Sequence, residues 1–179
     1  MQKERTMSTS HMVRTALLAA ILCIVGPFAI PIGAVPISLT TLVLYFLVYL
    51  LDGKHALISY TVYFLLGLVG LPVFSGFSGG VGKVAGPTGG YLIGFFLMIP
   101  CAAWMVKCFG KNRMGQAWGL LLATLIAYAF GVTWFVISMS CDVYYALSVG
   151  VVPFLIGDFL KIALAVWSGP ALRKRIRVV

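Results

Sequence analysis

The chain has 179 residues, of which 61% are hydrophobic and only 9% are charged. This composition excludes a soluble globular domain and predicts a membrane protein, with room for about six spans of ~20 residues each. The net charge of +9 does not indicate nucleic-acid binding, because the basic residues stand at the ends of apolar segments rather than among aromatic residues in a soluble region.

The apolar segments predict an all-α, polytopic membrane protein with six transmembrane helices in a single membrane domain, residues 1–179. The expected helices cover residues 13–28, 36–51, 56–71, 88–106, 116–138 and 149–167. Pro36 suits the first turn of the second helix, since proline lacks only an N–H that is unpaired there. The polar residues 52–55 are expected to form the turn that follows.

A glycine-rich loop at residues 72–86 separates the third and fourth helices. Backbone of this composition near a membrane has to line an enclosed or watery cavity. The apolar residues within it, Phe74 among them, favour a packed loop over a flexible external turn. The sequence GPTGG at 86–90 then begins a helix, whose free N–H groups and positive dipole end favour an anionic or carbonyl-bearing ligand.

The expected sixth helix contains two charged side chains, Asp158 and Lys161. An ionisable group deep in a membrane helix costs at least ~2.5–3.5 kcal/mol on insertion scales, so it rarely faces lipid. At i, i+3 the two side chains share one helical face and can neutralise each other. They form either a structural ion pair or part of a binding site for a polar solute. The scarcity of other charges in the spans favours the binding site.

The basic residues predict the orientation. Of the 13 lysines and arginines, Lys83 falls on one side of six alternating helices, Lys161 falls within a span, and the remaining eleven share the other side. These eleven are Lys3, Arg5, Arg14, Lys54, Lys107, Lys111, Arg113, Arg173, Lys174, Arg175 and Arg177. The positive-inside rule therefore predicts that both termini are cytoplasmic.

Two further patterns concern helix contacts. Ala16 and Ala20 stand at a small-xxx-small spacing that allows another helix to approach closely, although alanine is common in any membrane helix. The hydroxyls of Ser59 and Thr124, within spans, are expected to bond to their own helix backbone.

The four cysteines are scattered, without CxxC spacing and without a histidine nearby in sequence. They are Cys23, Cys101, Cys108 and Cys141. This pattern predicts no metal site and no cofactor.

Three stretches resemble the BioY family, the biotin-specific S components of energy-coupling factor (ECF) transporters. They are GPTGGYLIGF at 86–95, preceded by PVFSGFSGGVGKVA; PFLIGDFLK at 153–161; and VPISLTT at 35–41. GPTGGY and GDxxK at this separation are fairly specific together, and the resemblance covers nearly the whole chain. Many members have Gln where Thr40 stands, so the role of a second-helix amide is not transferred.

The resemblance implies a protein of the bacterial cell membrane that captures biotin from outside and releases it inwards. An energising module of one transmembrane T component and two ATPase subunits would drive release, since the chain has no Walker motif. Ala16 and Ala20 are the implied T-component interface. The expected substrate-binding residues supply a charged pair, a helix start and apolar cover. They are Phe74, Gly86, Thr88, Gly89, Gly90, Tyr91, Asp158 and Lys161.

The sequence leaves two other functional classes to compare with this one. A self-sufficient, proton-coupled secondary transporter of a small carboxylate solute would use Asp158 as the proton carrier and Lys161 as its regulator. Such transporters usually contain internal repeats, and the chain has no second GDxxK and no second glycine-rich loop. A membrane enzyme or assembly factor is disfavoured, because the sequence has no histidine cluster, paired carboxylates or activated nucleophile. We therefore expect no catalytic residues.

Overall fold

The computed structural model describes residues 9–31 and 34–177. In these residues the chain is almost entirely helical, with one short hairpin, so the all-α prediction is confirmed. The elements are α1 (Thr9–Val25), β1 (Ala29–Ile30), β2 (Ile37–Ser38), α2 (Thr40–Leu50), α3 (Gly53–Leu68), α4 (Val81–Ala85), α5 (Gly89–Phe109), α6 (Arg113–Met139), α7 (Val143–Gly150) and α8 (Val152–Arg177). Lys3 and Arg5, which enter the predicted charge bias, lie outside the described residues.

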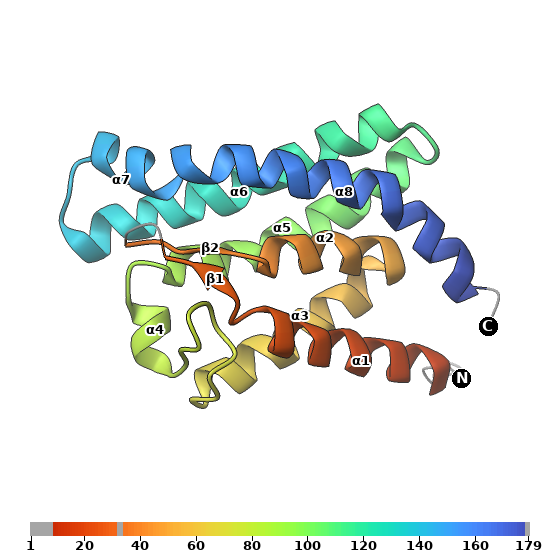
Figure 1. Cartoon of the computed structure of the whole chain (residues 1–179), viewed down its shortest axis with the longest axis horizontal. Coiled ribbons are helices and arrows are strands. Elements are labelled where there is room, and N and C mark those ends of the chain that lie inside the picture. The colour runs from red at the N-terminus through yellow and green to blue at the C-terminus, as the bar shows by residue number, and fades with distance from the viewer. Residues whose placement is uncertain (1–8, 32–33, 178–179) are drawn as a thin grey trace, which may run out of the picture.

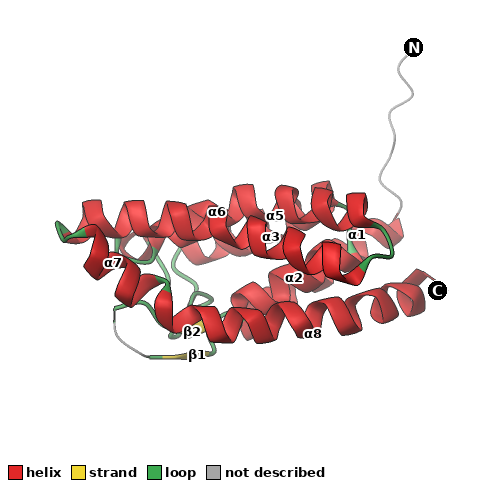
Figure 2. Ribbon diagram, turned by 90° about the horizontal axis from the view of Figure 1, so that it is seen from above, coloured by secondary structure: helices red, strands yellow, loops and turns green. Residues whose placement is uncertain are grey.

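The long helices run side by side along the long axis of the molecule (Figures 1 and 2). α5 packs along α6, α2 packs against α8, and α1 packs against α3. The start of α1 and the end of α8 lie at one end of the bundle, whereas α4 and α7 lie towards the other (Figure 1). The buried core between these helices is apolar and rich in tyrosine and phenylalanine.

The helices differ in their ability to cross a membrane. In the described part of the chain, three helical segments are long and apolar enough to do so: Gly89–Phe109, Arg113–Met139 and Val143–Arg175, the last of which joins α7 to α8. α1 and α2 are apolar but shorter. At 1.5 Å per residue, the 11 residues of α2 cover ~16 Å, about half of a typical hydrocarbon core.

The expected second helix begins four residues too early. Pro36 does not start a helix, because the chain around it forms the β1–β2 hairpin, in which Ala29 pairs antiparallel with Ser38. The N–H of Leu39 also donates to the carbonyl of Phe28, at 3.2 Å. These backbone pairs hold Ile37 and Ser38 extended, and α2 begins only at Thr40.

The expected sixth helix, 149–167, is longer and is broken near its start. α7 ends at Gly150, Val151 has non-helical dihedral angles (φ −126°, ψ −54°), and α8 runs on to Arg177. Pro153 stands in the first turn of α8, where its missing N–H costs no intrahelical bond. α8 also contacts β2.

The glycine-rich segment is a packed loop that contains the short helix α4. Phe74 is fully buried, and its ring lies 5.5 Å from that of Tyr63 and 6.1 Å from that of Phe64. The N–H of Gly80 donates to the carbonyl of Gly67, at 2.7 Å. The loop is therefore tied to the end of α3 by both ring packing and backbone hydrogen bonds.

Hydroxyl groups within the helices make two kinds of bond. Thr124 Oγ1 donates to the carbonyl of Leu120 in its own helix, at 2.7 Å, as predicted. The same prediction for Ser59 is wrong, because its Oγ donates to the carbonyl of Thr15 in α1, at 2.8 Å. α1 and α3 approach closely enough here for a short side chain to reach the neighbouring backbone.

The contact of Gly67 with Phe74 gives a test of how the loop is held. A Cβ on Gly67 would lie 2.2 Å from Phe74 Cζ, whereas a Cβ on Gly82 would have no neighbour within 4 Å. We expect Gly67→Ala to lower the free energy of unfolding by about 1–3 kcal/mol through overpacking. Thermal unfolding in detergent measures this, with Gly82→Ala as the control. Equal stability of the two variants would contradict the proposed packing role.

Candidate functional site

A cavity lies among β2, α2, α5, α6 and α8, and we call it the candidate cavity. Part of its wall is apolar: Val35, Pro36, Leu92, Phe95, Ala127 and Phe154. The remainder carries polar or phenolic side chains: Ser38, Thr40, Thr41, Tyr63, Ser75, Thr88, Tyr91, Thr124, Asp158 and Lys161. An enclosure that combines apolar side chains with converging hydrogen-bonding groups is typical of sites for small molecules.

The two charged residues of α8 lie in this wall and pair with each other. Asp158 is 4% exposed and Lys161 is 7% exposed, and Lys161 Nζ lies 2.9 Å from Asp158 Oδ1. The pairing predicted from their i, i+3 spacing is confirmed. Because each charge neutralises the other, the cavity can hold two strong hydrogen-bonding groups within an apolar bundle.

All three N–H donors of the Lys161 ammonium have partners. Besides Asp158, Nζ donates to the carbonyl of Ser38 and to Thr41 Oγ1, each at 2.9 Å. An ammonium has only three donors. A ligand that bonds to Lys161 therefore has to take over one of these positions, and two of the present partners, Ser38 and Thr41, belong to the β2–α2 segment.

The carboxylate of Asp158 connects three helices. Tyr128 Oη in α6 donates to Oδ2 at 2.6 Å, and Thr41 Oγ1 in α2 donates to Oδ1 at 3.3 Å. Hydrogen bonds to an ionised acceptor are among the stronger ones in proteins. The charged pair is therefore both a part of the cavity wall and a tie among α2, α6 and α8.

Thr88 stands at the N-terminal end of α5 and carries an unpaired hydroxyl. Its side chain is buried, and Oγ1 has no hydrogen-bond partner among the described residues. Burying a polar group without a partner costs about 1–3 kcal/mol. A ligand in the candidate cavity that bonds to this hydroxyl would recover that free energy, so Thr88 points to a ligand with a polar group.

The ring of Tyr91 forms an apolar part of the wall. Its hydroxyl donates to the carbonyl of Gly150, at 2.8 Å, and its ring stacks near Phe154, with centroids 6.5 Å apart. Because the hydroxyl is used at the end of α7, the ring is fixed in position beside the cavity.

The structure brings together only some of the predicted substrate-binding residues. Thr88, Tyr91, Asp158 and Lys161 line the candidate cavity, whereas Phe74, Gly86, Gly89 and Gly90 are not in its lining. Phe74 packs instead against Tyr63 and Phe64 of α3, as described above.

The three glycines provide close packing between the loop, α5 and α6. Trp134 Nε1 donates to the carbonyl of Gly86, at 3.0 Å. A Cβ on Gly89 would lie 1.7 Å from the carbonyl oxygen of Val84, and one on Gly90 would lie 2.2 Å from Trp134 Cβ. The close backbone contacts at these glycines are therefore made with other parts of the protein.

Two hydrogen-bond partners of the charged pair, Thr41 and Tyr128, had no role in the sequence prediction. Thr41 lies within the VPISLTT stretch, which carries part of the family resemblance. Its place in that stretch was therefore a signal that could have indicated a role at the site. Tyr128 carried no signal, because a tyrosine in a long apolar helix resembles the buried tyrosines elsewhere in the core. Its contact with Asp158 spans 30 residues of sequence and arises only when α6 packs on α8.

The comparisons with known proteins identify the family. The model of the BioY family matches residues 1–178. This chain belongs to the BioY family. It is therefore a multi-pass membrane protein and a transporter component rather than an enzyme.

Relatives within the BioY family resemble the chain along most of its length. The "Biotin transporter BioY" of Thermotoga maritima is 34% identical and covers 92% of this chain and 96% of its own. The "Biotin transporter BioY2" of Lactococcus lactis is 32% identical, with 88% and 86% covered. A crystal structure at 2.1 Å of the S-component for biotin from an ECF-type ABC transporter superposes with a TM-score of 0.86 at 28% identity, covering 94% of this chain and 95% of that one.

The network around Asp158 predicts unequal effects for two buried tyrosines. Tyr128 donates to a carboxylate, whereas Tyr45 Oη shares a neutral hydrogen bond of 2.6 Å with Thr124. Tyr128→Phe should lower the free energy of unfolding by about 1.5–3 kcal/mol, and Tyr45→Phe by about 0.5–1.5 kcal/mol. Unfolding titrations in detergent measure both. A smaller effect at Tyr128 than at Tyr45 would show that Asp158 does not depend on this donor.

Proposed function

We propose that this chain is the biotin-specific S component of an ECF-type transporter and that biotin binds in the candidate cavity. Its membership of the BioY family and its likeness to an S component for biotin support this function. The observation that carries the choice of site is the charged pair of Asp158 and Lys161 in one cavity with the Thr88 hydroxyl, which has no hydrogen-bond partner among the described residues. No observation favours a self-sufficient, proton-coupled transporter.

The chemistry of the cavity suits each part of biotin. The vitamin offers a carboxylate, a polar ureido group, and an apolar thioether ring with an aliphatic chain. Lys161, the Asp158 carboxylate and Thr88 offer charged and neutral hydrogen-bonding groups. Tyr91, Phe95 and Phe154 can cover the apolar parts, as small-molecule sites usually require.

In this proposal Lys161 changes partners when biotin binds. A biotin oxygen takes the place of the Ser38 carbonyl, while the contact of Lys161 with Asp158 is kept. This exchange avoids leaving either buried charge without a partner, which would be costly. Four of the expected binding residues act indirectly, by holding the 72–86 loop and the start of α5 in place. They are Phe74, Gly86, Gly89 and Gly90.

The energising partners are expected to be a T component and two ATPase subunits. Ala16 and Ala20 are exposed on α1 and line an apolar groove between α1 and α3. The rest of the groove is formed by Met12, Thr15, Ala19, Cys23, Ile58, Val62 and Leu66. Small side chains on its floor allow a helix of the T component to approach closely.

The orientation proposed for the bacterial cell membrane places both termini in the cytoplasm. The start of α1 and the end of α8 lie at the same end of the bundle (Figure 1). Lys54, Lys107 and Arg173 line one pocket together, which shows that basic residues from α3, α5 and α8 also gather at one place. The positive-inside rule assigns such a basic end to the cytoplasm.

Biotin titration tests the cavity. We expect Lys161→Ala to weaken binding by about 2–5 kcal/mol, because the remaining carboxylate loses its charged partner, and Asp158→Asn to weaken it similarly. Thr88→Val should weaken binding by about 0.5–1.5 kcal/mol, or up to about tenfold. It should not lower the stability of the free protein, because the hydroxyl has no partner there. Calorimetry with purified protein in detergent gives the affinities.

The matched control is Thr133→Val, since Thr133 is exposed on α6 and is not in the lining of the candidate cavity. Thiamine and riboflavin, titrated in parallel, test the choice of vitamin. If folded Lys161→Ala, Asp158→Asn and Thr88→Val all bind biotin within threefold of the wild type, biotin binds elsewhere.

The α1 groove gives a separate prediction. Ala16→Trp should abolish co-purification with the T component and ATPases and leave biotin affinity unchanged, because the bulky ring fills the groove without reaching the cavity. Leu17→Trp is the control: Leu17 is 59% exposed on the same helix but does not line the groove. Loss of biotin binding together with assembly would instead assign Ala16 to the fold or the substrate site.

A further inference from the structure

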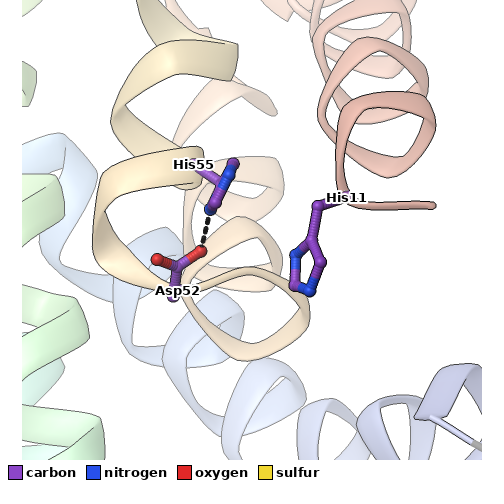
Figure 3. Close-up of side chains that lie close together, drawn as sticks. All are labelled: His11, Asp52 and His55. Atoms are coloured by element: carbon purple, nitrogen blue, oxygen red, sulfur yellow. Dashed lines mark hydrogen bonds and ion pairs between the residues drawn. The ribbon is translucent and has the colours of Figure 1, made fainter. Parts of the chain in front are cut away.

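A second cluster of side chains lies outside the candidate cavity. It consists of His11 from α1, Asp52 at the N-terminal end of α3, and His55 from the first turn of α3 (Figure 3). One possible ligand atom from each side chain lies within 4.8 Å of the others. The sequence separates the two histidines by 44 positions, so their proximity comes from the packing of α1 on α3.

The three side chains already face one another. The rings of His11 and His55 have centroids 5.2 Å apart and planes tilted by 32°. His55 Nδ1 forms a close contact with Asp52 Oδ1, shown as the dashed line in Figure 3. The other ring nitrogen, His55 Nε2, is buried and has no hydrogen-bond partner among the described residues.

The usual role of such an aspartate does not account for the arrangement. Asp52 occupies the N-cap position of α3 with extended backbone angles, where its carboxylate would normally accept a hydrogen bond from the first turn. It makes no such capping bond. Its carboxylate contacts His55 instead, whose side chain is 14% exposed. The carboxylate of Asp52 remains accessible to solvent, because the Asp52 side chain is 58% exposed.

We propose that His11, Asp52 and His55 bind a divalent transition metal ion of the Zn²⁺ type. Two imidazole nitrogens and one carboxylate are a ligand set that Zn²⁺ accepts, with water completing four-fold coordination. Hard cations such as Mg²⁺ prefer oxygen ligands and are not expected to bind here. The carboxylate either ligates the ion directly or orients His55 from behind, and both arrangements occur in protein zinc sites.

The cluster can reach the required geometry through side-chain rotation. Zinc–ligand bonds of about 2.0–2.2 Å place neighbouring ligand atoms roughly 3.2–3.6 Å apart. The present limit of 4.8 Å is slightly wider. Asp52 already contacts His55, and His11 is exposed, so a rotation of the His11 side chain would close the cluster.

The bound ion would connect α1 to the α2–α3 turn. This connection lies at the end of the bundle where α1 begins, away from α7 (Figure 1). Since an ion that binds only the folded state stabilises it, Zn²⁺ should raise the thermal stability of the protein. The effect does not depend on biotin and is independent of the function proposed above.

The test uses the full-length protein in detergent, purified without a histidine tag. All four cysteines, which are free thiols, are replaced by alanine so that no thiolate binds the ion. We expect this parent protein to bind one Zn²⁺ per chain by calorimetry and to unfold at a higher temperature with Zn²⁺ than with Mg²⁺. Co²⁺ should give an absorption spectrum of nitrogen and oxygen coordination.

Variants of the three residues decide the assignment. His11→Ala and His55→Ala should each weaken Zn²⁺ binding at least tenfold, and Asp52→Asn by roughly 10–100-fold. Asp142→Asn is the control, because Asp142 caps α7 at the far end of the bundle. The proposal is overturned if the parent shows no saturable Zn²⁺ binding. It is equally overturned if folded His11→Ala, an exposed position, binds Zn²⁺ within threefold of the parent.

Discussion

The buried pair of Asp158 and Lys161 is the interaction on which the interior of this protein depends. An unpaired charge would be expensive at this depth in a membrane helix, so each group requires a neutralising partner. The pair extends by hydrogen bonds to Thr41 in α2 and Tyr128 in α6. Because neither charge can be left unpaired, the pair is surrounded by hydrogen-bonding partners from α2 and α6. These bonds connect three helices and place several hydrogen-bonding groups in one wall of the cavity.

The surroundings of this network divide into groups that can meet a ligand and groups that position them. The Thr88 hydroxyl has no hydrogen-bond partner among the described residues, and it is therefore available to a ligand. The Tyr91 hydroxyl donates a hydrogen bond to the end of α7, so only the Tyr91 ring can contact a ligand. Gly89 and Gly90 allow the chain to approach Val84 and Trp134, which fixes the start of α5. A cluster of glycines beside a binding site can thus be needed for packing rather than for contact with the ligand.

The proposed functions use different parts of the same bundle. Biotin is assigned to the cavity between α2, α5, α6 and α8, and the T component to the groove between α1 and α3. The proposed metal site joins α1 to α3 near the start of that groove, through His11 and His55. α1 and α3 therefore form a unit that packs against the binding half of the molecule without lining most of its cavity.

The sequence by itself determined the membrane class, the all-α fold, the family resemblance and the pairing of Asp158 with Lys161. These follow from local properties: hydropathy over a helix length, short motifs, and an i, i+3 spacing. Such a spacing places two side chains on the same face of one helix, whichever helices pack beside it. Only the tertiary structure decided that Tyr128 and Thr41 join the pair, that Phe74 and the glycines stay out of the cavity, and that His11 meets His55. Such contacts depend on which helix faces pack together, and residues far apart in sequence carry no local signal of it.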